Sequence, residues 1–220
     1  MTPKAKIRRA AQALDKLYGP LSKRPQGQML GALVETILSQ NTTDLNSQRA
    51  YSQLRGRFRT WEAARRAGPT AIEDQIRVGG LAGTKARRIH ALLQQLHKTY
   101  GRCDLEFLRE LPTELLLEEL LRIPGVGPKT ALVVASFEDG RPVFPMDTHV
   151  HRVLTRLGVI SGDRARIETH REVERWIEPQ RLHSLHLQLI ELGREQCRPR
   201  PRCASCPLAK ICDYAQEQKL

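Results

Sequence analysis

The sequence predicts an all-α fold, and three observations lead to that prediction. Apolar residues recur at helical spacing along much of the chain. Gly and Pro residues separate these periodic segments, at 19–20, 68–69, 79–80, 124–128 and 140–142. No run of alternating β-branched residues predicts a strand. The length of 220 residues allows one domain or two small ones.

The apolar stripes show where the helices are expected, in order along the chain. They consist of Leu30, Leu33, Val34, Ile37 and Leu38; of Ile89, Leu92, Leu93 and Leu96; of Leu117, Leu120 and Leu121; and of Leu182, Leu185, Leu189, Ile190 and Leu192. Intervals of three and four residues place the members of a stripe on one face of a helix, which is expected to be buried. The third stripe follows a Pro-Thr pair at 112–113, which suits the start of a helix.

The charge balance predicts a polyanionic partner. Thirty-six Lys and Arg residues against 24 Asp and Glu give a net charge of +12. Nucleic acid is the commonest partner of such a chain, although a basic protein without one is also compatible. No apolar run approaches the roughly 18 residues of a membrane span, and the N-terminus lacks the apolar core of a signal peptide. We therefore expect no membrane partner and a cytoplasmic, nucleoid-associated protein.

The segment Leu-Arg-Ile-Pro-Gly-Val-Gly-Pro-Lys-Thr-Ala at 121–131 predicts a helical hairpin that holds a phosphate. Gly125 and Gly127 permit positive φ and close approach of another backbone. Pro128 suits the first position of the next helix, where free amides form an anion site. A tight turn without a ligand is the ordinary alternative. A weak echo at 77–86, Arg-Val-Gly-Gly-Leu-Ala-Gly-Thr-Lys-Ala, predicts either a second backbone contact or a simple glycine turn.

A lysine and an aspartate accompany this hairpin. Lys129 begins the second helix, and Asp147 follows eighteen residues later in Phe-Pro-Met-Asp-Thr-His. A neutral lysine amine can displace a base at C1′ of a nucleotide and form a Schiff base, which a carboxylate cannot. An aspartate can accept the proton of the amine and stabilise positive charge on the sugar. Taken singly, a surface lysine and a helix-capping aspartate are ordinary; as a pair beside this hairpin, they indicate catalysis.

Four cysteines near the C-terminus predict a metal centre. Cys197, Cys203, Cys206 and Cys212 are spaced C-x5-C-x2-C-x5-C. In a reducing compartment such a cluster favours metal ligation over disulfides. Zinc sites usually show two close cysteine pairs, and only one is present here. The spacing therefore departs from that of a usual zinc site, and zinc and the absence of any metal remain as alternatives.

Together these motifs resemble the helix-hairpin-helix DNA glycosylases, and within them the endonuclease III family. That family carries Leu-Pro-Gly-Val-Gly-x-Lys-Thr-Ala and Val-Asp-Thr-His at the same spacing, and C-x6-C-x2-C-x5-C, one residue longer than here in its first loop. The resemblance implies that Lys129 is the nucleophile, that Asp147 is the catalytic aspartate, and that the four cysteines bind a 4Fe–4S cluster. It also implies DNA contacts from Gly125, Val126, Gly127, Thr130, His149, Arg198, Arg200 and Arg202.

The resemblance further implies two helical lobes with a DNA-binding cleft between them. Residues 24–133 are expected to form a helical barrel that ends in the hairpin. Residues 1–23 and 134–220 are expected to form the second domain, with the cluster loop at 197–212. The implied function is a monomeric, bifunctional glycosylase and abasic-site (AP) lyase that removes oxidised pyrimidines from damaged double-stranded DNA.

The segment Leu-Ser-Gln-Asn-Thr-Thr-Asp at 38–44 is expected to fill the gap left by a flipped base. Gln40 and Asn41 are the candidates, and Asp44 is expected to cap the next helix. Glu35 lies one helical turn before Ser39, where adenine-mismatch glycosylases carry a catalytic glutamate. It keeps open a mismatch glycosylase, directed at adenine or thymine, as the alternative. A non-catalytic DNA-binding module is the second alternative.

Overall fold

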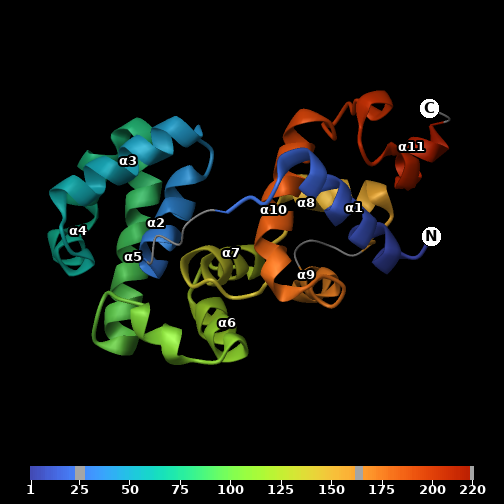
Figure 1. Ribbon diagram of the computed structural model, residues 1–220. Helices are drawn as coiled ribbons and strands as arrows, with labels where there is room; N and C mark the ends of the chain where they lie inside the picture. The colour runs from blue at the N-terminus through green and yellow to red at the C-terminus, as the bar shows by residue number, and fades with distance from the viewer. Residues whose placement is uncertain (23–27, 162–165, 219–220) are drawn as a thin grey trace. The chain divides into compact units, whose positions relative to one another are not determined.

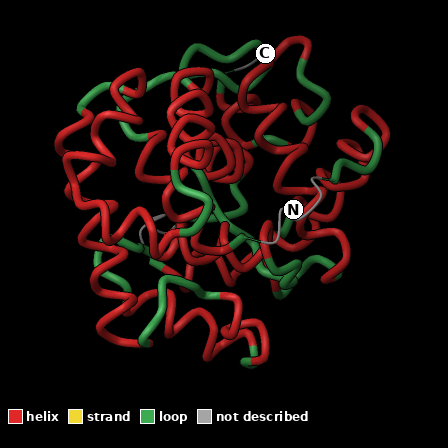
Figure 2. Tube along the Cα trace, turned by 90° about the vertical axis from the view of Figure 1, so that its left-hand side faces the viewer, coloured by secondary structure: helices red, strands yellow, loops and turns green. Residues whose placement is uncertain are grey.

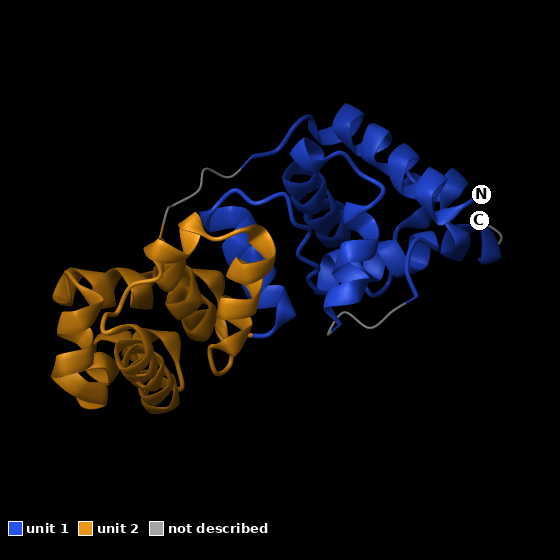
Figure 3. Cartoon of the chain, turned by 90° about the horizontal axis from the view of Figure 1, so that it is seen from below, with its two compact units in different colours: residues 1–26, 127–220 blue, residues 27–126 orange. Residues whose placement is uncertain are grey.

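The computed structural model describes residues 1–22, 28–161 and 166–218. Within these ranges the chain forms eleven α-helices, four short 3-10 helices and no strand, so the predicted all-α fold is confirmed (Figure 1, Figure 2). The chain divides into two compact units, which are coloured separately in Figure 3. Unit 1 comprises residues 1–26 and 127–220, and unit 2 comprises residues 27–126.

The two units contain the following helices. Those of unit 1 are α1 (Pro3–Tyr18), α7 (Pro128–Glu138), α8 (Thr148–Leu157), α9 (Ile167–Glu174), α10 (Pro179–Glu195) and α11 (Asp213–Glu217). Those of unit 2 are α2 (Met29–Ser39), α3 (Asp44–Arg57), α4 (Trp61–Ile76), α5 (Ala82–Tyr100) and α6 (Thr113–Arg122). None of the described helices combines the length and the hydropathy that a membrane span requires.

Unit 2 is held together by the predicted apolar stripes. The stripe on α2 is buried except for Ile37, which is half-buried, and the stripe on α5 is buried throughout. The break expected at 68–69 lies inside α4, where Gly68 has a φ of 82° and precedes Pro69. Proline removes a helical hydrogen bond and the left-handed glycine turns the chain, so α4 is kinked there.

Unit 1 brings the first helix of the chain together with its later helices. Its core contains Ile7 and Leu14 of α1, Leu154 of α8 and Leu189 of α10, all fully buried. Each such side chain contributes roughly 1.5–3 kcal/mol by leaving water. The unit therefore depends on contacts between residues that are far apart in the sequence.

Polar contacts also fix α1 within unit 1. Asp15 pairs with Arg181 of α10 and accepts a hydrogen bond from the Gln188 amide at 2.9 Å. The same amide donates to the carbonyl of Gly19 at 2.7 Å, at the end of α1. Lys6 pairs with Asp213 at the start of α11.

Candidate active site and cysteine cluster

Two glycines of different conformation form the turn of the hairpin. Gly125 has a φ of 85°, and the amide of Val126 donates to the Ile123 carbonyl at 3.0 Å. Gly127 has a φ of −94° and is the N-cap of α7. Of the two glycines, only Gly125 uses the positive φ that both permit, because Gly127 is a cap residue with extended backbone. A Cβ atom on either glycine would have no neighbour within 4 Å, so the backbone is accessible here.

The first turn of α7 places its amides beside this accessible backbone. Pro128 is the first residue of the helix, and Lys129 follows it with an exposed side chain. Thr130 is half-buried. Amides in a first helical turn have no acceptor within the helix and carry partial positive charge. The hairpin therefore offers an anion position next to the lysine amine.

Asp147 begins α8 as its N-cap. One of its carboxylate oxygens, Oδ1, accepts a hydrogen bond from the Val150 amide at 2.8 Å, and the side chain is half-buried. The capping role proposed as the ordinary alternative is therefore present. Capping also fixes the orientation of the carboxylate, so it does not exclude a chemical role.

His186 of α10 lies in the same electrostatic environment as both residues. It is 3 % exposed, and its Nδ1–H donates to the Pro145 carbonyl at 2.9 Å, two residues before Asp147. Burial lowers the pKa of His186 to about 4; the Asp147 carboxylate acts in the opposite direction, whereas His183 and Lys129 lower the pKa further. The imidazole is thus neutral near pH 7. The charges of Lys129 on α7 and of Asp147 on α8 therefore both act on this one imidazole.

His186 belongs to none of the sequence motifs that predict the site. The available signal was a polar residue one turn after His183, between the buried Leu185 and Leu189 of the α10 stripe. The ring packs against two aromatic residues, with centroids 5.3 Å from Phe137 and 6.0 Å from Phe144. Only the folded chain brings these groups together.

His149 is held between α8 and α10. Arg152 donates a hydrogen bond to its Nδ1 at 3.1 Å. A Cβ atom on Gly193 would lie 2.8 Å from the Cβ of His149, so the glycine permits the close approach of the two helices. Arg152 also donates to the carbonyls of Gly193 and Cys197, at 2.9 and 2.7 Å. These contacts connect the Asp-Thr-His segment with the first cysteine of the cluster.

The four cysteines line a single cavity of unit 1, together with Tyr214 and Arg156. Cys203 is buried and the other three are half-buried. Burial, and the neighbouring cysteines as further causes, raise the pKa of both Cys206 and Cys212. The four thiols therefore converge on one space, as a multidentate metal site requires.

The spacing of the sulfur atoms bears on the choice between zinc and a larger cluster. Four sulfurs at 2.3 Å from one zinc ion would lie about 3.8 Å apart. In the part of the chain that the structure describes, no three of these sulfurs lie within 4.8 Å of one another. As they lie here, the four sulfurs do not have the spacing of a single tetrahedral zinc site.

Arg156 of α8 fixes the arginine-rich loop of this cluster. Its guanidinium donates to the carbonyls of Arg198 and Pro199, at 2.6 and 3.0 Å, and contacts the Cys197 sulfur at 3.5 Å. It also lies 4.7 Å from the centroid of the Tyr214 ring. These contacts fix the backbone of the loop. The side chains of Arg198, Arg200 and Arg202 are exposed.

The candidate base-gap residues lie in unit 2, between α2 and α3. Gln40 accepts a hydrogen bond from Arg88 at 2.7 Å. Asn41 is exposed and has a φ of 51°. Thr43, not Asp44, caps α3, because the Thr43 hydroxyl accepts from the Asn46 amide at 3.3 Å. Glu35 lies half-buried on α2.

A second turn is tied to this segment by a buried lysine. Lys85 of α5 is 2 % exposed, and its Nζ donates to the carbonyls of Leu38 and Gly79, both at 2.7 Å. Between Gly79 and α5 lies Leu81, 60 % exposed with a φ of 48°. The echo at 77–86 is thus a turn whose lysine points inward. Among the described residues, Asn41 and Leu81 are the only non-glycine residues with positive φ.

Residues 34–179 match the family model described as the HhH-GPD superfamily base excision DNA repair protein. An endonuclease III from Thermotoga maritima is 33 % identical over 183 residues, which cover 83 % of this chain and 81 % of the relative. A solved non-covalent endonuclease III–DNA complex matches with a TM-score of 0.80 and 29 % identity, covering 100 % of this chain and 99 % of the other. A trapped endonuclease III–DNA covalent intermediate gives the same TM-score at 28 % identity, and 100 % of each chain is covered.

Proposed function

Because this chain belongs to the HhH-GPD superfamily of base excision DNA repair proteins, as an endonuclease III-like DNA glycosylase, we propose that it is bifunctional. It excises oxidised pyrimidines and then cleaves the strand as an AP lyase. The environment of His186 supports this most directly, since the electrostatics of that imidazole involve both Lys129 and Asp147. The solved relative in a trapped covalent intermediate with DNA agrees with chemistry of this kind.

In this mechanism the Lys129 amine is the nucleophile. Its nitrogen forms a bond to C1′ as the glycosidic bond to the damaged base breaks, and the base leaves with the bonding electron pair and takes a proton from water. Asp147 receives the proton of the attacking amine and stabilises the positive charge that develops on the sugar. Opening of the sugar ring gives an imine between Lys129 and C1′. The imine acidifies the 2′ proton, whose removal expels the 3′ phosphate by β-elimination.

The remaining residues would hold the DNA. The amides after Gly125 and Gly127 suit a phosphate of the damaged strand. Arg198, Arg200 and Arg202 are exposed on a backbone fixed by Arg156, so they can meet further phosphates. His149 and Thr130 remain predicted contacts. These interactions position DNA without reading its sequence.

Unit 2 would supply the side chains that replace the flipped nucleotide. Gln40 and Asn41 offer planar amides, and the exposed Leu81 offers an apolar wedge. Lys85 holds the backbone on both sides of this pair of turns, through Leu38 and Gly79. A fixed backbone lowers the entropy lost when a side chain inserts into the duplex.

Cys197, Cys203, Cys206 and Cys212 would hold a 4Fe–4S cluster. Their shared cavity fits such a group, and their sulfurs do not have the spacing of a single tetrahedral zinc site. When bound, the cluster would supply four metal–thiolate bonds that order residues 197–212. Arg156 and Arg152 would keep that loop in register with α8 and α10.

Borohydride trapping tests the proposed function. A duplex with one thymine glycol is incubated with the cluster-loaded protein in sodium borohydride, which reduces the imine to a stable amine. We expect a covalent protein–DNA adduct that is lost in Lys129→Ala, whose side chain is exposed and whose removal should leave the fold intact. Asp147→Asn keeps a residue that can cap α8 and should lower the rate of adduct formation at least 100-fold.

The other outcomes identify the alternatives. An adduct that forms only on an abasic-site duplex would leave a lyase with a different base preference. Release of adenine or thymine from mismatches without any adduct would favour the mismatch glycosylase and a role for Glu35. Binding without either reaction, by folded and cluster-loaded protein, would leave only the DNA-binding module.

A further inference from the structure

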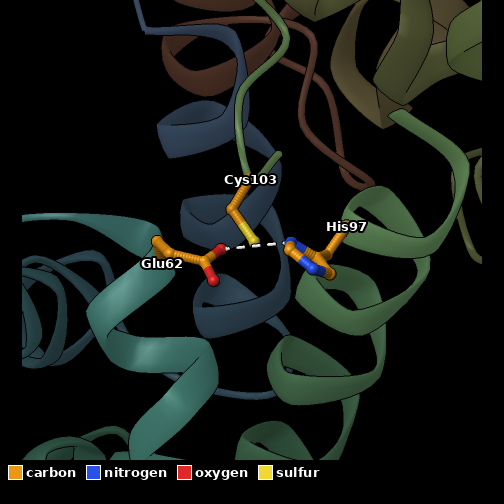
Figure 4. A group of neighbouring side chains, drawn as sticks. All are labelled: Glu62, His97 and Cys103. Carbon is orange, nitrogen blue, oxygen red and sulfur yellow. Dashed lines mark ion pairs between the residues drawn. The ribbon is translucent and has the colours of Figure 1, made fainter. Parts of the chain in front are cut away.

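Three potential metal ligands converge in unit 2, apart from every residue assigned above. Glu62 belongs to the first turn of α4, His97 to the last turn of α5, and Cys103 follows α5 (Figure 4). One ligand atom from each lies within 4.8 Å of the other two. We propose that Glu62, His97 and Cys103 bind a Zn²⁺ ion.

The Nδ1 atom of His97 gives the first argument for a ligand. It is buried and has no hydrogen-bond partner among the described residues. Its contact with Glu62 Oε2, at 3.4 Å, lacks hydrogen-bond geometry. Buried polar atoms in folded proteins nearly always have a partner, and an ion or a water molecule accounts for many that lack one. A cation between His97 and Glu62 would satisfy this nitrogen.

The two oxygens of Glu62 have different surroundings. Oε1 accepts hydrogen bonds from Arg65 Nη2 at 2.6 Å and Nε at 3.1 Å, and from Arg66 Nε at 3.3 Å. Oε2 faces His97 and accepts one hydrogen bond from an arginine, Arg65 Nε, at 3.2 Å. The Cys103 thiol also forms a hydrogen bond with this carboxylate. The hydrogen bonds from Arg65 lower the pKa of Glu62 to about 2, so the carboxylate is ionised. Arginines on Oε1 would fix the orientation of the carboxylate while Oε2 binds the ion, as groups hydrogen-bonded to metal ligands do in other sites.

Cys103 completes the group with a sulfur donor. The residue is buried, and its thiol donates to the Leu93 carbonyl at 3.3 Å. Burial, together with the Glu62 carboxylate, raises the pKa of this thiol to about 12. The free thiol is therefore protonated and inert to ordinary alkylation or oxidation. When Zn²⁺ binds, the thiol proton is released to solvent and the sulfur bonds to the metal.

The donor set selects zinc among the common divalent ions. A thiolate, an imidazole and a carboxylate are the ligands of tetrahedral Zn²⁺, whereas Mg²⁺ and Ca²⁺ prefer oxygen alone. Three protein ligands leave a fourth position, and the three residues line an open pocket through which water can reach it. The four cysteines of the other cavity do not form such a compact group among the described residues.

A zinc ion here would link the ends of two packed helices. α4 and α5 pack closely against each other, and the ligands come from the first turn of one and the last turn of the other. The ion would also attach the segment that begins at Cys103. The ion pair between Glu62 and Arg65 accounts for the position of the carboxylate without a metal ion. It does not provide a hydrogen-bond partner for Nδ1 of His97.

Zinc binding is measured on the full chain with its iron–sulfur cluster already assembled, so that the four cluster cysteines are occupied. The protein is dialysed against buffered free Zn²⁺, and zinc and iron per chain are determined by elemental analysis. We expect one zinc per chain at unchanged iron content. Cys103→Ser and His97→Gln should weaken zinc binding at least tenfold. His90→Gln is the matched control, because His90 lies on the same helix and contacts α4 through the Arg65 carbonyl, outside the group.

Two further measurements keep the result interpretable. Saturating zinc should raise the melting temperature of the wild type and of His90→Gln by several degrees. It should leave the melting temperatures of Cys103→Ser and His97→Gln unchanged. The ¹¹³Cd resonance of the cadmium-substituted protein should show one thiolate ligand, which distinguishes this site from a four-cysteine site. Cluster-loaded wild type that takes up no zinc at micromolar free metal overturns the proposal. Zinc binding that is unchanged in both ligand variants also overturns the proposal.

Discussion

The single most informative residue outside the predicted motifs is His186. The sequence motifs point to Lys129 and Asp147 because each belongs to a short, specific pattern. His186 belongs to no such pattern, and its role depends on the hydrogen bond from α10 to the Pro145 carbonyl. Local sequence could reveal a histidine in an apolar stripe; it could not reveal which loop that histidine would meet.

His186 gives the protein a dependence of stability on pH. Its pKa is about 4 in the folded chain, against an ordinary value of about 6.5. Between these values the unfolded chain binds a proton that the folded chain does not, so the free energy of unfolding decreases as pH falls from 6.5 to 4. Replacement by Asn keeps a hydrogen-bond donor near the position of Nδ1 but removes the titration.

Urea unfolding of wild type and His186→Asn at pH 7 and pH 5 measures this effect. We expect the wild type to lose about 1–2 kcal/mol more than the variant between these pH values. Equal losses in the two proteins would contradict the assignment.

At the scale of the elements, periodicity predicted the helices well and their detailed ends less well. The stripes on α2, α5 and α10 and the break in α4 follow from local spacing. The cap of α3 did not, because Thr43 and Asp44 both suit an N-cap and only the backbone geometry selects Thr43. Contacts between segments that are distant in sequence could not be predicted from local spacing. Lys85 is an example, because its buried side chain binds the carbonyls of Leu38 and Gly79.

The contact between α8 and α10 sets a size limit at Gly193. A methyl group there would lie 2.8 Å from the Cβ of His149, a distance that requires backbone movement. Gly193→Ala should therefore lower the free energy of unfolding by about 1–3 kcal/mol despite the higher helix propensity of alanine. Thermal unfolding measures the change.

Gly56→Ala is the control for helix propensity. Gly56 lies on α3, and a Cβ atom there would have no neighbour within 4 Å. That substitution should be neutral or stabilise the protein by up to about 1 kcal/mol. A stabilised Gly193→Ala variant would mean that α8 and α10 can separate without loss.

At the scale of the whole molecule, the sequence predicted the fold class and the net charge of +12. It could not show which Arg and Lys side chains bind other groups of the protein and which are available to bind phosphates of DNA. The structure distinguishes them by burial, because Arg152 and Arg156 are half-buried and bound to carbonyls, whereas Arg198, Arg200 and Arg202 are exposed. Of these three, Arg198 also donates through Nε to the Arg194 carbonyl, at 2.7 Å. Only the second set is expected to meet DNA.

The salt dependence of DNA binding tests that distinction. Replacing Arg198, Arg200 and Arg202 with Gln should make the slope of log K against log salt shallower by up to about 3, because each phosphate contact contributes about 0.9. The control replaces the exposed Arg66, Lys98 and Arg102, which removes the same charge from the chain. Equal slopes for the two triple variants would show that the cysteine loop has no special role.

The way α1 is bound has a consequence for the order of folding during synthesis. Unit 2 is one continuous stretch, so its contacts can form soon after it leaves the ribosome. The apolar face of α1 is translated before its partners on α8 and α10, which follow more than a hundred residues later. Until they emerge, Ile7 and Leu14 remain without their native cover. α1 is therefore packed only after unit 2, α8 and α10 have been translated, and its apolar face stays exposed until then.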